Sequence, residues 1–479
     1  MPETAPETVP DAALQPSQSR TRRVMDHVTQ LIARRELEAG EKLPSIRRCA
    51  AALSVSPSTV VEAYDRLVAQ GVIYARRGAG FFVSDTAALR PRSLPQIDTA
   101  RARDIDPLWV SRQSLDADVA AHKPGCGWLP ADWMPTEAMR RALRGLARAD
   151  DPLLAYYGSA KGEVALRNLL SRRFATQGLA AEPAQILLTA SGSQAIDLIC
   201  RLLLSQGDTV LVDDPCYFNF QALLRAHRIK LVSVPYTPEG PDIAAFEAAL
   251  KTHRPRLYIT NSALHNPTGA TMSAQVAHRV LSLASAHDLT VIEDDIFAEF
   301  EPDLSPRLAA LDGLQRVIRI GSFSKTLSAS ARCGFIAAHP DWIEALVDLQ
   351  VATNFGGPSP LVVALIDSVL SDGSYHKHME ALRLRLAKRR REVARKLSGR
   401  GIVPWVQPRG GFYLWCELPD GVDAAEVARH ALARDLVLAP GNVFSAAQNK
   451  AGFMRFNVSQ MGTPEGFARL GEALQAARP

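Results

Sequence analysis

The chain has 479 residues, of which 47% are hydrophobic and 22% are charged, a balance typical of globular proteins with a buried core. Its six cysteines are scattered without C-x-x-C spacing, which argues against a zinc site or a disulfide scaffold and fits a reducing cytoplasm. No run reaches the roughly 18 apolar residues of a membrane helix, and the N-terminus lacks the basic and apolar regions of a signal peptide. We therefore expect a cytoplasmic protein of about two to four domains, with no metal site and no membrane contact.

The net charge of +5 is unevenly distributed along the chain. Residues 1–19 are rich in Pro, Glu, Ala and Ser, carry a net charge of −3 and are predicted to form a disordered tail. Residues 20–83 hold 11 Lys/Arg against 6 Asp/Glu, so this short segment has a basic excess. A basic excess confined to one small segment favours contact with a polyanion.

Residues 20–84 have the pattern of a small helical domain. Apolar residues at helical spacing predict a first helix around 24–32. Ser45 can cap a second helix, and after a short turn Ser56 can cap a third. A helix, a short turn and a capped helix form the helix-turn-helix layout.

A hairpin follows, and its tip, Arg76-Arg77-Gly78-Ala79-Gly80, is basic and rich in glycine. This addition predicts a winged helix-turn-helix. The residues expected to reach bases or phosphates are basic or hydroxyl side chains of the helices and the wing: Arg47, Ser56, Ser58, Thr59, Arg76 and Arg77. The alternative is a three-helix interaction module with a solvated, charged face.

These motifs resemble the DNA-binding domain of GntR-type bacterial regulators over residues 22–83. The resemblance rests on Leu43-Pro44-Ser45-x-Arg47, on the turn from Val55 to Val60, and on Gly78-x-Gly80-x-Phe82-Val83. It implies binding to double-stranded DNA. One position departs, because Pro57 stands where the family often has an arginine.

Residues 85–106 contain prolines and mixed charge with few apolar side chains, which predicts a linker. From residue 107 to 479 the pattern becomes that of an α/β domain with a mostly parallel sheet. The predicted strands are apolar, β-branched runs near residues 186–189, 209–212, 231–234, 256–260, 290–292 and 317–320. In such a sheet, ligands bind at the carboxyl ends of the strands.

Polar clusters follow several of these strands, and each is ambiguous by itself. Ser191 to Gln194 opens a helix and could hold an anion, or could be an ordinary helix cap. Tyr217 could stack on a ring or belong to the core, and Asp294 could be a surface acid or the partner of a cationic ring nitrogen. Lys325 follows the last strand and could form a Schiff base with an aldehyde cofactor, or could be a solvated loop residue.

Together these clusters resemble the domain of fold-type I aminotransferases, which depend on pyridoxal phosphate (PLP), over about residues 115–475. The resemblance implies that Lys325 bonds the cofactor, Asp294 pairs with the ring nitrogen, Asn266 bonds the phenolic oxygen and Tyr217 stacks on the ring. The residues implied to hold the phosphate are Gly192, Ser193, Gln194, Ser322 and Arg332, with Tyr157 reaching into the neighbouring subunit's site. Arg455 matches the arginine that clamps an amino-acid carboxylate.

One further position departs from the aminotransferase pattern, because Phe297 stands where that family usually has a tyrosine. A GntR-like winged helix joined to such a domain resembles the MocR-type (GabR-like) transcription regulators. This implies a head-to-tail homodimer that senses an amine or amino acid through Lys325. The alternative function is an active aminotransferase with an appended DNA-binding domain. The sequence does not distinguish half-transamination from full catalytic turnover.

Overall fold

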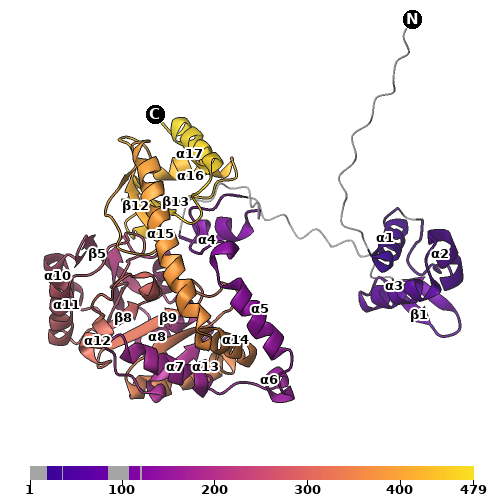
Figure 1. Cartoon of the computed structure of the whole chain (residues 1–479), viewed down its shortest axis with the longest axis horizontal. Helices are drawn as coiled ribbons and strands as arrows, with labels where there is room; N and C mark the ends of the chain where they lie inside the picture. Colours follow the sequence, from indigo (N-terminus) through magenta and orange to yellow (C-terminus); the bar gives the residue numbers. More distant parts are fainter. Residues whose placement is uncertain (1–18, 35, 85–106, 119–120, 479) are drawn as a thin grey trace, which may run out of the picture. The chain divides into compact units, whose positions relative to one another are not determined.

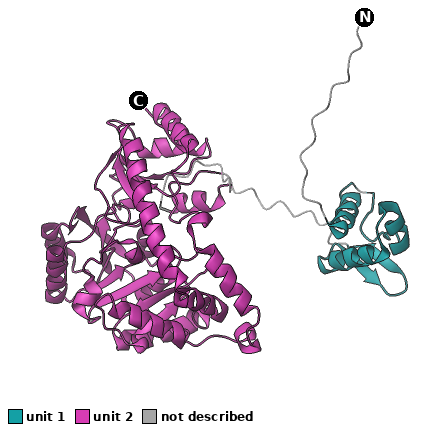
Figure 2. Ribbon diagram, in the orientation of Figure 1, with its two compact units in different colours: residues 1–102 teal, residues 103–479 magenta. Residues whose placement is uncertain are grey.

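The computed structural model describes residues 19–34, 36–84, 107–118 and 121–478. These residues form two compact units, with the division between residues 102 and 103 (Figures 1 and 2). Almost all of the expected tail at 1–19 and the whole expected linker at 85–106 lie outside the described residues.

The smaller unit is the predicted winged helix-turn-helix. Its elements in chain order are α1 (Arg20–Ala33), α2 (Ile46–Leu53), α3 (Pro57–Ala69), β1 (Ile73–Arg76) and β2 (Gly80–Val83). Ser45 and Ser56 cap α2 and α3 as predicted, and their side chains accept hydrogen bonds from the backbone N–H groups of Arg48 and Thr59. The two strands pair antiparallel, with Arg76 opposite Gly80 next to the tip. Tyr64 lies in the core of this unit and donates to the carbonyl of Pro44 at 3.0 Å, which ties α3 to the start of α2.

The larger unit is built on an eight-stranded sheet in the order β3-β10-β9-β8-β7-β4-β5-β6. The strands are β3 (Ile186–Thr189), β4 (Thr209–Asp214), β5 (Lys230–Thr237), β6 (Gly240–Pro241), β7 (Leu257–Thr260), β8 (Thr290–Asp294), β9 (Val317–Ser322) and β10 (Gly334–Ala337). All neighbouring pairs are parallel except those made by β10 and β6. The prediction of a mostly parallel α/β sheet is therefore confirmed. The antiparallel strand β10 was not predicted.

Helices cover both faces of this sheet, which explains why its strands are apolar along their whole length. Along β3, Ile186 and Leu188 lie in one core, whereas Leu187 lies in the core on the opposite face. The helices are α4 (Pro107–Asp116), α5 (Thr136–Leu146), α6 (Asp151–Ala155), α7 (Val164–Ala175), α8 (Gly192–Leu203), α9 (Phe218–Ala226), α10 (Ile243–His253), α11 (Ala274–Ala286), α12 (Leu308–Asp312), α13 (Pro340–Asn354) and α14 (Pro360–Ser371).

A small subdomain follows the long helix α15 (Ser374–Ser398). Its four-stranded antiparallel sheet has the order β11-β12-β14-β13. The elements are β11 (Val403–Pro404), β12 (Tyr413–Glu417), α16 (Ala424–Leu432), β13 (Ala439–Pro440), the short helix η5 (Gly441–Phe444), β14 (Phe453–Asn457) and α17 (Pro464–Ala476). Within the described residues, no helix is long and apolar enough to cross a bilayer.

Candidate functional site

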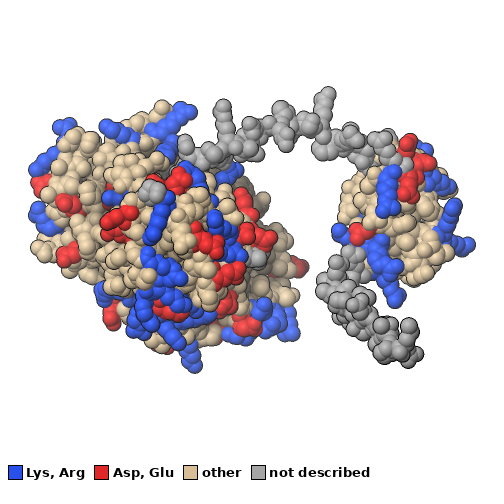
Figure 3. Space-filling model, turned by 90° about the horizontal axis from the view of Figure 1, so that it is seen from above, with Lys and Arg blue, Asp and Glu red and all other residues tan. Residues whose placement is uncertain are grey.

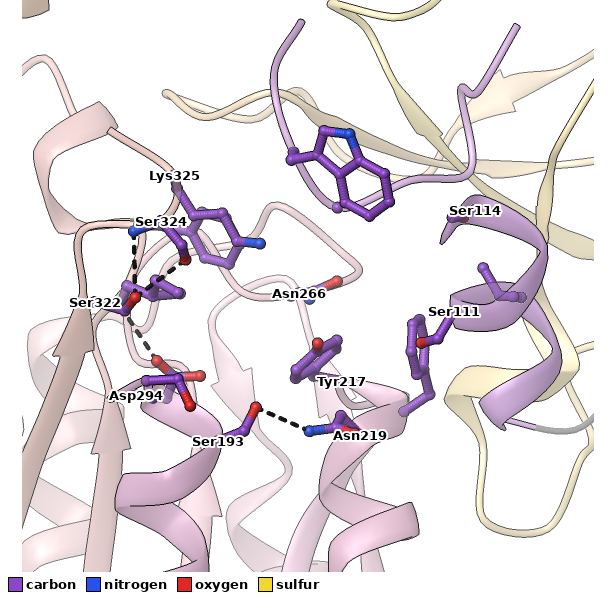
Figure 4. Close-up of a pocket in the computed structure, with 18 of the residues that line it drawn as sticks. Ser111, Ser114, Ser193, Tyr217, Asn219, Asn266, Asp294, Ser322, Ser324 and Lys325 are labelled. Atoms are coloured by element: carbon purple, nitrogen blue, oxygen red, sulfur yellow. Dashed lines mark hydrogen bonds between the residues drawn. The ribbon is translucent and has the colours of Figure 1, made fainter. Parts of the chain in front are cut away.

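A cavity of about 340 Å³ lies at the carboxyl ends of the parallel strands (Figure 4). The predicted site residues that line it come from segments far apart in the chain: Gly192, Ser193, Tyr217, Asn266, Asp294, Ser322, Lys325, Arg332 and Arg455. Most of them meet because parallel strands end at the same edge of a sheet, whereas Arg455 comes from β14 of the small antiparallel sheet. Two predicted residues do not line the cavity of this chain, namely Gln194 and Tyr157.

Gln194 stabilises the loop beneath the cavity. Its side-chain oxygen accepts a hydrogen bond from the backbone N–H of Ala190 at 2.6 Å. The backbone N–H of Gln194 donates to Ser191 Oγ at 3.0 Å. Tyr157 is 80% exposed and packs edge-on against Phe355, with ring centres 5.0 Å apart.

Three consecutive acids lie at the end of strand β8, with Asp295 directly after it, and the fold accommodates them in different ways. Glu293 accepts hydrogen bonds from the backbone N–H groups of Leu308 and Ala309 at the start of α12. Asp295 forms ion pairs with Arg307 at 2.8 Å and Arg319 at 2.6 Å, all of them buried. Asp294 also is buried, but it forms no ion pair with any described residue, and it lines the cavity. Of these three acids, Asp294 is therefore the one that lines the cavity, and it does so without a cationic partner among the described residues.

Burial shifts the proton equilibria of two groups that line the cavity. It raises the pKa of Asp294 to about 7 and lowers the pKa of Lys325 to about 8. Desolvation disfavours the charged form of each group in the cofactor-free protein. A cationic ring nitrogen beside Asp294 would favour its carboxylate, and a lysine that is partly neutral near pH 8 is a better nucleophile than an ordinary one.

The cavity wall carries more cationic than anionic groups. Lys325, Arg332 and Arg455 form no ion pairs with the described residues. Arg455 is 1% exposed, and it donates to Asn266 Oδ1 at 2.8 Å and to the carbonyl of Gly125 at 2.7 Å. Its Nε has no hydrogen-bond partner among the described residues. A buried guanidinium without a counter-charge is costly, so the wall favours anionic ligand groups.

A tyrosine, Tyr413, lines the same cavity as Lys325, although position 297 lacks a tyrosine. Phe297 is buried and packs edge-on against Tyr413, with ring centres 5.5 Å apart. A Cβ at Gly127 would lie 3.2 Å from the Tyr413 hydroxyl and 3.7 Å from Lys325 Nζ, so the glycine keeps this space open. Burial raises the pKa of Tyr413, which keeps its hydroxyl protonated and able to donate at neutral pH.

Several cavity residues were missed by the sequence interpretation. Tyr413 lies on β12 of the small subdomain, and the sequence interpretation gave it no role in the site. The Gly125-Cys126-Gly127-Trp128 loop also lines the wall, and its Gly-x-Gly-aromatic pattern was the available signal. Ser111 and Ser114 on α4 line the wall as well, and no motif marks them.

The smaller unit presents the predicted DNA-contacting residues on its surface. Arg47, Arg76 and Arg77 are exposed and form no ion pairs with described residues. The guanidinium of Arg76 lies 5.4 Å from the ring centre of Tyr74 and 5.1 Å from that of Phe82. These cation–π contacts hold Arg76 on the wing. Figure 3 shows basic side chains on the surface of this unit.

The hydroxyl side chains at the start of α3 differ in hydrogen bonding and in exposure. Ser56 Oγ accepts from the N–H of Thr59 and lies 2.8 Å from both Ser58 Oγ and Thr59 Oγ1. Its hydroxyl is therefore engaged in the cap. Ser58 is exposed and Thr59 is half-buried, so Ser58 is the more accessible of the two to a ligand.

Two family models match the chain. The model of aminotransferase class I and II matches residues 129–474. The chain belongs to this family. The model of the gntR family of bacterial regulatory proteins matches residues 20–83, so the predicted fusion of a GntR-type domain with an aminotransferase-like domain is confirmed.

Similar proteins carry both regulator and aminotransferase names. The chain is 31% identical to the uncharacterized HTH-type transcriptional regulator YdcR of Escherichia coli K12, over 91% of this chain and 95% of that protein. It is 30% identical to a 2-aminoadipate transaminase of Thermus thermophilus, over 73% of this chain and 89% of that protein. Among solved structures, LysN, an alpha-aminoadipate aminotransferase from Thermus thermophilus complexed with N-(5'-phosphopyridoxyl)-L-leucine, matches with 28% identity and a TM-score of 0.70, covering 76% of this chain and 94% of that one.

The residues of the cavity fit the PLP cofactor that this family implies. Asp294 is a buried acid without a cation, and Lys325 is a lysine whose pKa is lowered by burial. Gly127 leaves space beside Lys325 Nζ that a side chain would fill. The N-terminus of α8 and the exposed Arg332 supply positive charge for a phosphate.

Proposed function

We propose that this protein is a PLP-dependent, DNA-binding transcription regulator of the MocR type. In this proposal the larger unit detects an amine or amino acid, and the smaller unit binds operator DNA. The observation that carries the proposal is a cavity lined by most of the predicted cofactor-binding residues, in the same chain as a GntR-type winged helix. The name of the E. coli relative, which this chain matches along 91% of its length, supports the regulator function.

PLP, when bound, supplies an aldehyde that exchanges amines and a ring that accepts electrons. Lys325 is proposed to bond its aldehyde carbon, and Asp294 to keep a proton on the ring nitrogen. Asn266 uses its side-chain oxygen for Arg455, which leaves its N–H₂ group to donate to the phenolic oxygen. Tyr217 is proposed to stack on the ring.

The phosphate group is proposed to bind at the start of α8 and beside β9. The residues involved are backbone or side-chain donors near these two elements: Gly192, Ser193, Ser322 and Arg332. Gln194 holds the loop from below rather than contacting the phosphate itself. In this chain the phosphate is therefore proposed to contact four of the five residues that the resemblance implies, without Gln194.

Arg455 is proposed to bind the carboxylate of an amino-acid effector. It is buried, lacks an acidic partner among the described residues, and lies on the wall of the same cavity as Lys325. Cation–π contacts with two aromatic rings hold its guanidinium in place. Arg455 Cζ lies 4.2 Å from the ring centre of Tyr413 and 4.8 Å from that of Phe444.

DNA binding is assigned to the wing and to the starts of α2 and α3. Arg47, Arg76 and Arg77 would neutralise phosphates, and Ser58 with Thr59 would reach base edges or phosphates. Ser56 contributes by capping α3 and so fixes the position of its first turn.

A head-to-tail homodimer is also proposed. Large apolar or aromatic side chains are exposed along the surface formed by α5, α6 and α14 and the segments next to them: Leu143, Leu154, Tyr156, Tyr157, Val164, Phe355 and Leu361. Both α5 and α6 pack against α14, so these side chains come from neighbouring elements. Large exposed apolar side chains on neighbouring elements favour a protein interface. In such a dimer Tyr157 would serve the partner's cofactor site.

The division of the chain that this function uses is a tail at 1–19, a winged helix at 20–84, a linker at 85–106 and an aminotransferase-like domain at 107–479. The cytoplasm is the proposed location. The second candidate function is an active aminotransferase. It is favoured by the Tyr413 hydroxyl on the wall of the same cavity as Lys325 and by the name of the Thermus relative.

Selection from a random duplex DNA library with the full-length, PLP-loaded chain tests the regulator function. We expect one enriched sequence that the protein binds at least about 10³-fold more tightly than random duplex, as for specific regulators. Enrichment of no sequence, combined with multi-turnover transamination at about 1 per second or faster, would instead support the enzyme.

A further inference from the structure

Helix α4 forms one wall of the cavity, across from Lys325 (Figure 4). It packs against α9 and against the short helix η5 of the small subdomain. Val110, Ser111, Ser114 and Leu115 on this helix line the cavity. In Figure 4, Ser111 and Ser114 of α4 lie on the opposite side of the cavity from Lys325, so a ligand held at Lys325 that spans the cavity would place its far end near α4.

Ser114 has an unsatisfied polar atom at this wall. The residue is 2% exposed, and its Oγ has no hydrogen-bond partner among the described residues. A helical serine commonly donates to the carbonyl four residues earlier, yet Ser114 Oγ does not bond that of Val110. A buried hydroxyl without a partner is costly, so this position favours a ligand that brings a polar atom to it.

The residues of α4 that line the cavity, as far as the structure describes this wall, carry no charge. The charged residues that line the cavity are Asp294, Lys325, Arg332 and Arg455, and all four have roles in the proposed function. The remaining lining residues are apolar, aromatic, glycine or uncharged polar residues. A second carboxylate on the ligand would therefore find no cation near α4 among the described residues of this chain, which is unfavourable.

We infer that the cavity selects an α-amino acid whose side chain is uncharged and ends in a hydroxyl or amide, and that Ser114 determines this specificity by bonding that end. This inference rests on the proposed function, since it needs Arg455 to hold the carboxylate and the cofactor to hold the amine. It adds the chemical class of the ligand and the residue that reads it.

The test is a titration of the cofactor absorbance of the full-length, PLP-loaded protein. The probes are pairs that differ only in a terminal hydroxyl or methyl group, at three lengths: L-serine and L-2-aminobutyrate, L-homoserine and L-norvaline, L-5-hydroxynorvaline and L-norleucine. A second set compares L-glutamine with L-glutamate and with L-2-aminoadipate.

We expect the hydroxyl or amide probe of suitable length to bind roughly three- to tenfold more tightly than its methyl counterpart, the ratio of one satisfied hydrogen bond. The two dicarboxylates should bind at least about tenfold more weakly than L-glutamine. Ser114→Ala should abolish the hydroxyl preference while leaving the methyl-ended probes within about twofold. Ser114→Thr, which keeps the hydroxyl, should retain the preference.

Ser282→Ala is the matched control, because Ser282 is an exposed serine on α11 whose hydroxyl donates to the carbonyl of His278. It should behave as wild type. Equal binding of hydroxyl and methyl probes, or tighter binding of a dicarboxylate, would overturn the inference and leave the amino-acid sensor intact. If no amino acid changed the cofactor absorbance, both the inference and the proposed function would fail.

Discussion

The two units present their functional side chains in opposite environments. In the smaller unit, Arg47, Arg76 and Arg77 are exposed and lie within about 30 residues of one another in the sequence. In the larger unit, Asp294 and Arg455 are buried, and the cavity wall draws on segments from Val110 to Arg455. Exposed charges act over a distance and are screened by salt, whereas buried ones depend on single partners.

This contrast predicts that substitutions of buried groups have larger effects than substitutions of exposed groups. Changing one buried group should alter stability or ligand affinity by several kcal/mol, since an uncompensated charge is left behind. Changing one exposed arginine should alter DNA affinity by about a factor of ten or less, and more at low salt than at high salt.

The largest contrast is predicted between two adjacent acids. Asp295→Asn should destabilise the protein by about 3–5 kcal/mol, because Arg307 and Arg319 lose their shared carboxylate. Asp294→Asn should stabilise the cofactor-free protein at pH 8 by about 2–4 kcal/mol, because it removes a buried carboxylate that lacks a cation. Denaturant unfolding of both variants measures this, and PLP affinity should fall for Asp294→Asn.

The pH dependence gives the sign of the Asp294 effect. The folded-state pKa is about 7, above that of an unfolded aspartate, so the folded protein binds more protons between about pH 4 and 7. Stability of the cofactor-free wild type should therefore fall relative to Asp294→Asn as the pH rises through this window. A constant difference between pH 4 and 8 would contradict the assignment.

Arg455 provides the next largest effect. Arg455→Ala should weaken binding of L-norvaline by roughly 30- to 1000-fold, because a buried, charge-assisted pair is lost. Binding of n-butylamine, which lacks the carboxylate, should change only a few-fold. Titration of the cofactor absorbance measures both ligands, and circular dichroism checks that the loss of the bonds to Asn266 and Gly125 leaves the fold intact.

The wing should give a smaller, salt-dependent effect. The double variant Arg76→Ala/Arg77→Ala should reduce affinity for all duplex sequences by roughly ten- to a hundredfold, and should lower the salt slope of log K by about 2. Arg22→Ala is the control, because Arg22 is exposed on α1 and already pairs with Asp26. An unchanged salt slope would show that the wing does not contact phosphate.

The smallest effect is expected at the cap of α3. Ser56→Ala should destabilise the smaller unit by about 1 kcal/mol, because the N–H of Thr59 loses its acceptor. Ser58→Ala should leave stability nearly unchanged and weaken DNA binding. Thermal unfolding followed in the full chain distinguishes the two, and equal stability of both variants would argue against the cap.

The winged helix could be predicted in detail because its determinants are local. The caps at Ser45 and Ser56 and the glycines of the wing act within a few residues of their partners. The strands of the larger sheet were also predictable, because a strand buried on both faces is apolar throughout. The antiparallel strand β10 was missed, since its sequence begins with glycine and ends with alanine, two residues that are depleted in strands, and holds a single β-branched residue.

The cavity was only partly predictable. Residues at strand ends, such as Asp294 and Lys325, follow from position in the sheet. Tyr413 and Ser114 come from the small subdomain and from α4, and their approach to the cavity depends on packing between distant segments. Such contacts leave no local pattern, which is why no spacing rule identified them.

The most direct test of the account is a measurement of DNA affinity with and without ligand. The PLP-loaded, full-length protein and the duplex selected from the random library would be titrated with an amino acid that changes the cofactor absorbance. The account predicts that DNA affinity changes by at least about fivefold in the wild type and does not change in Lys325→Ala. Identical DNA affinity in the wild type at saturating amino acid would contradict it.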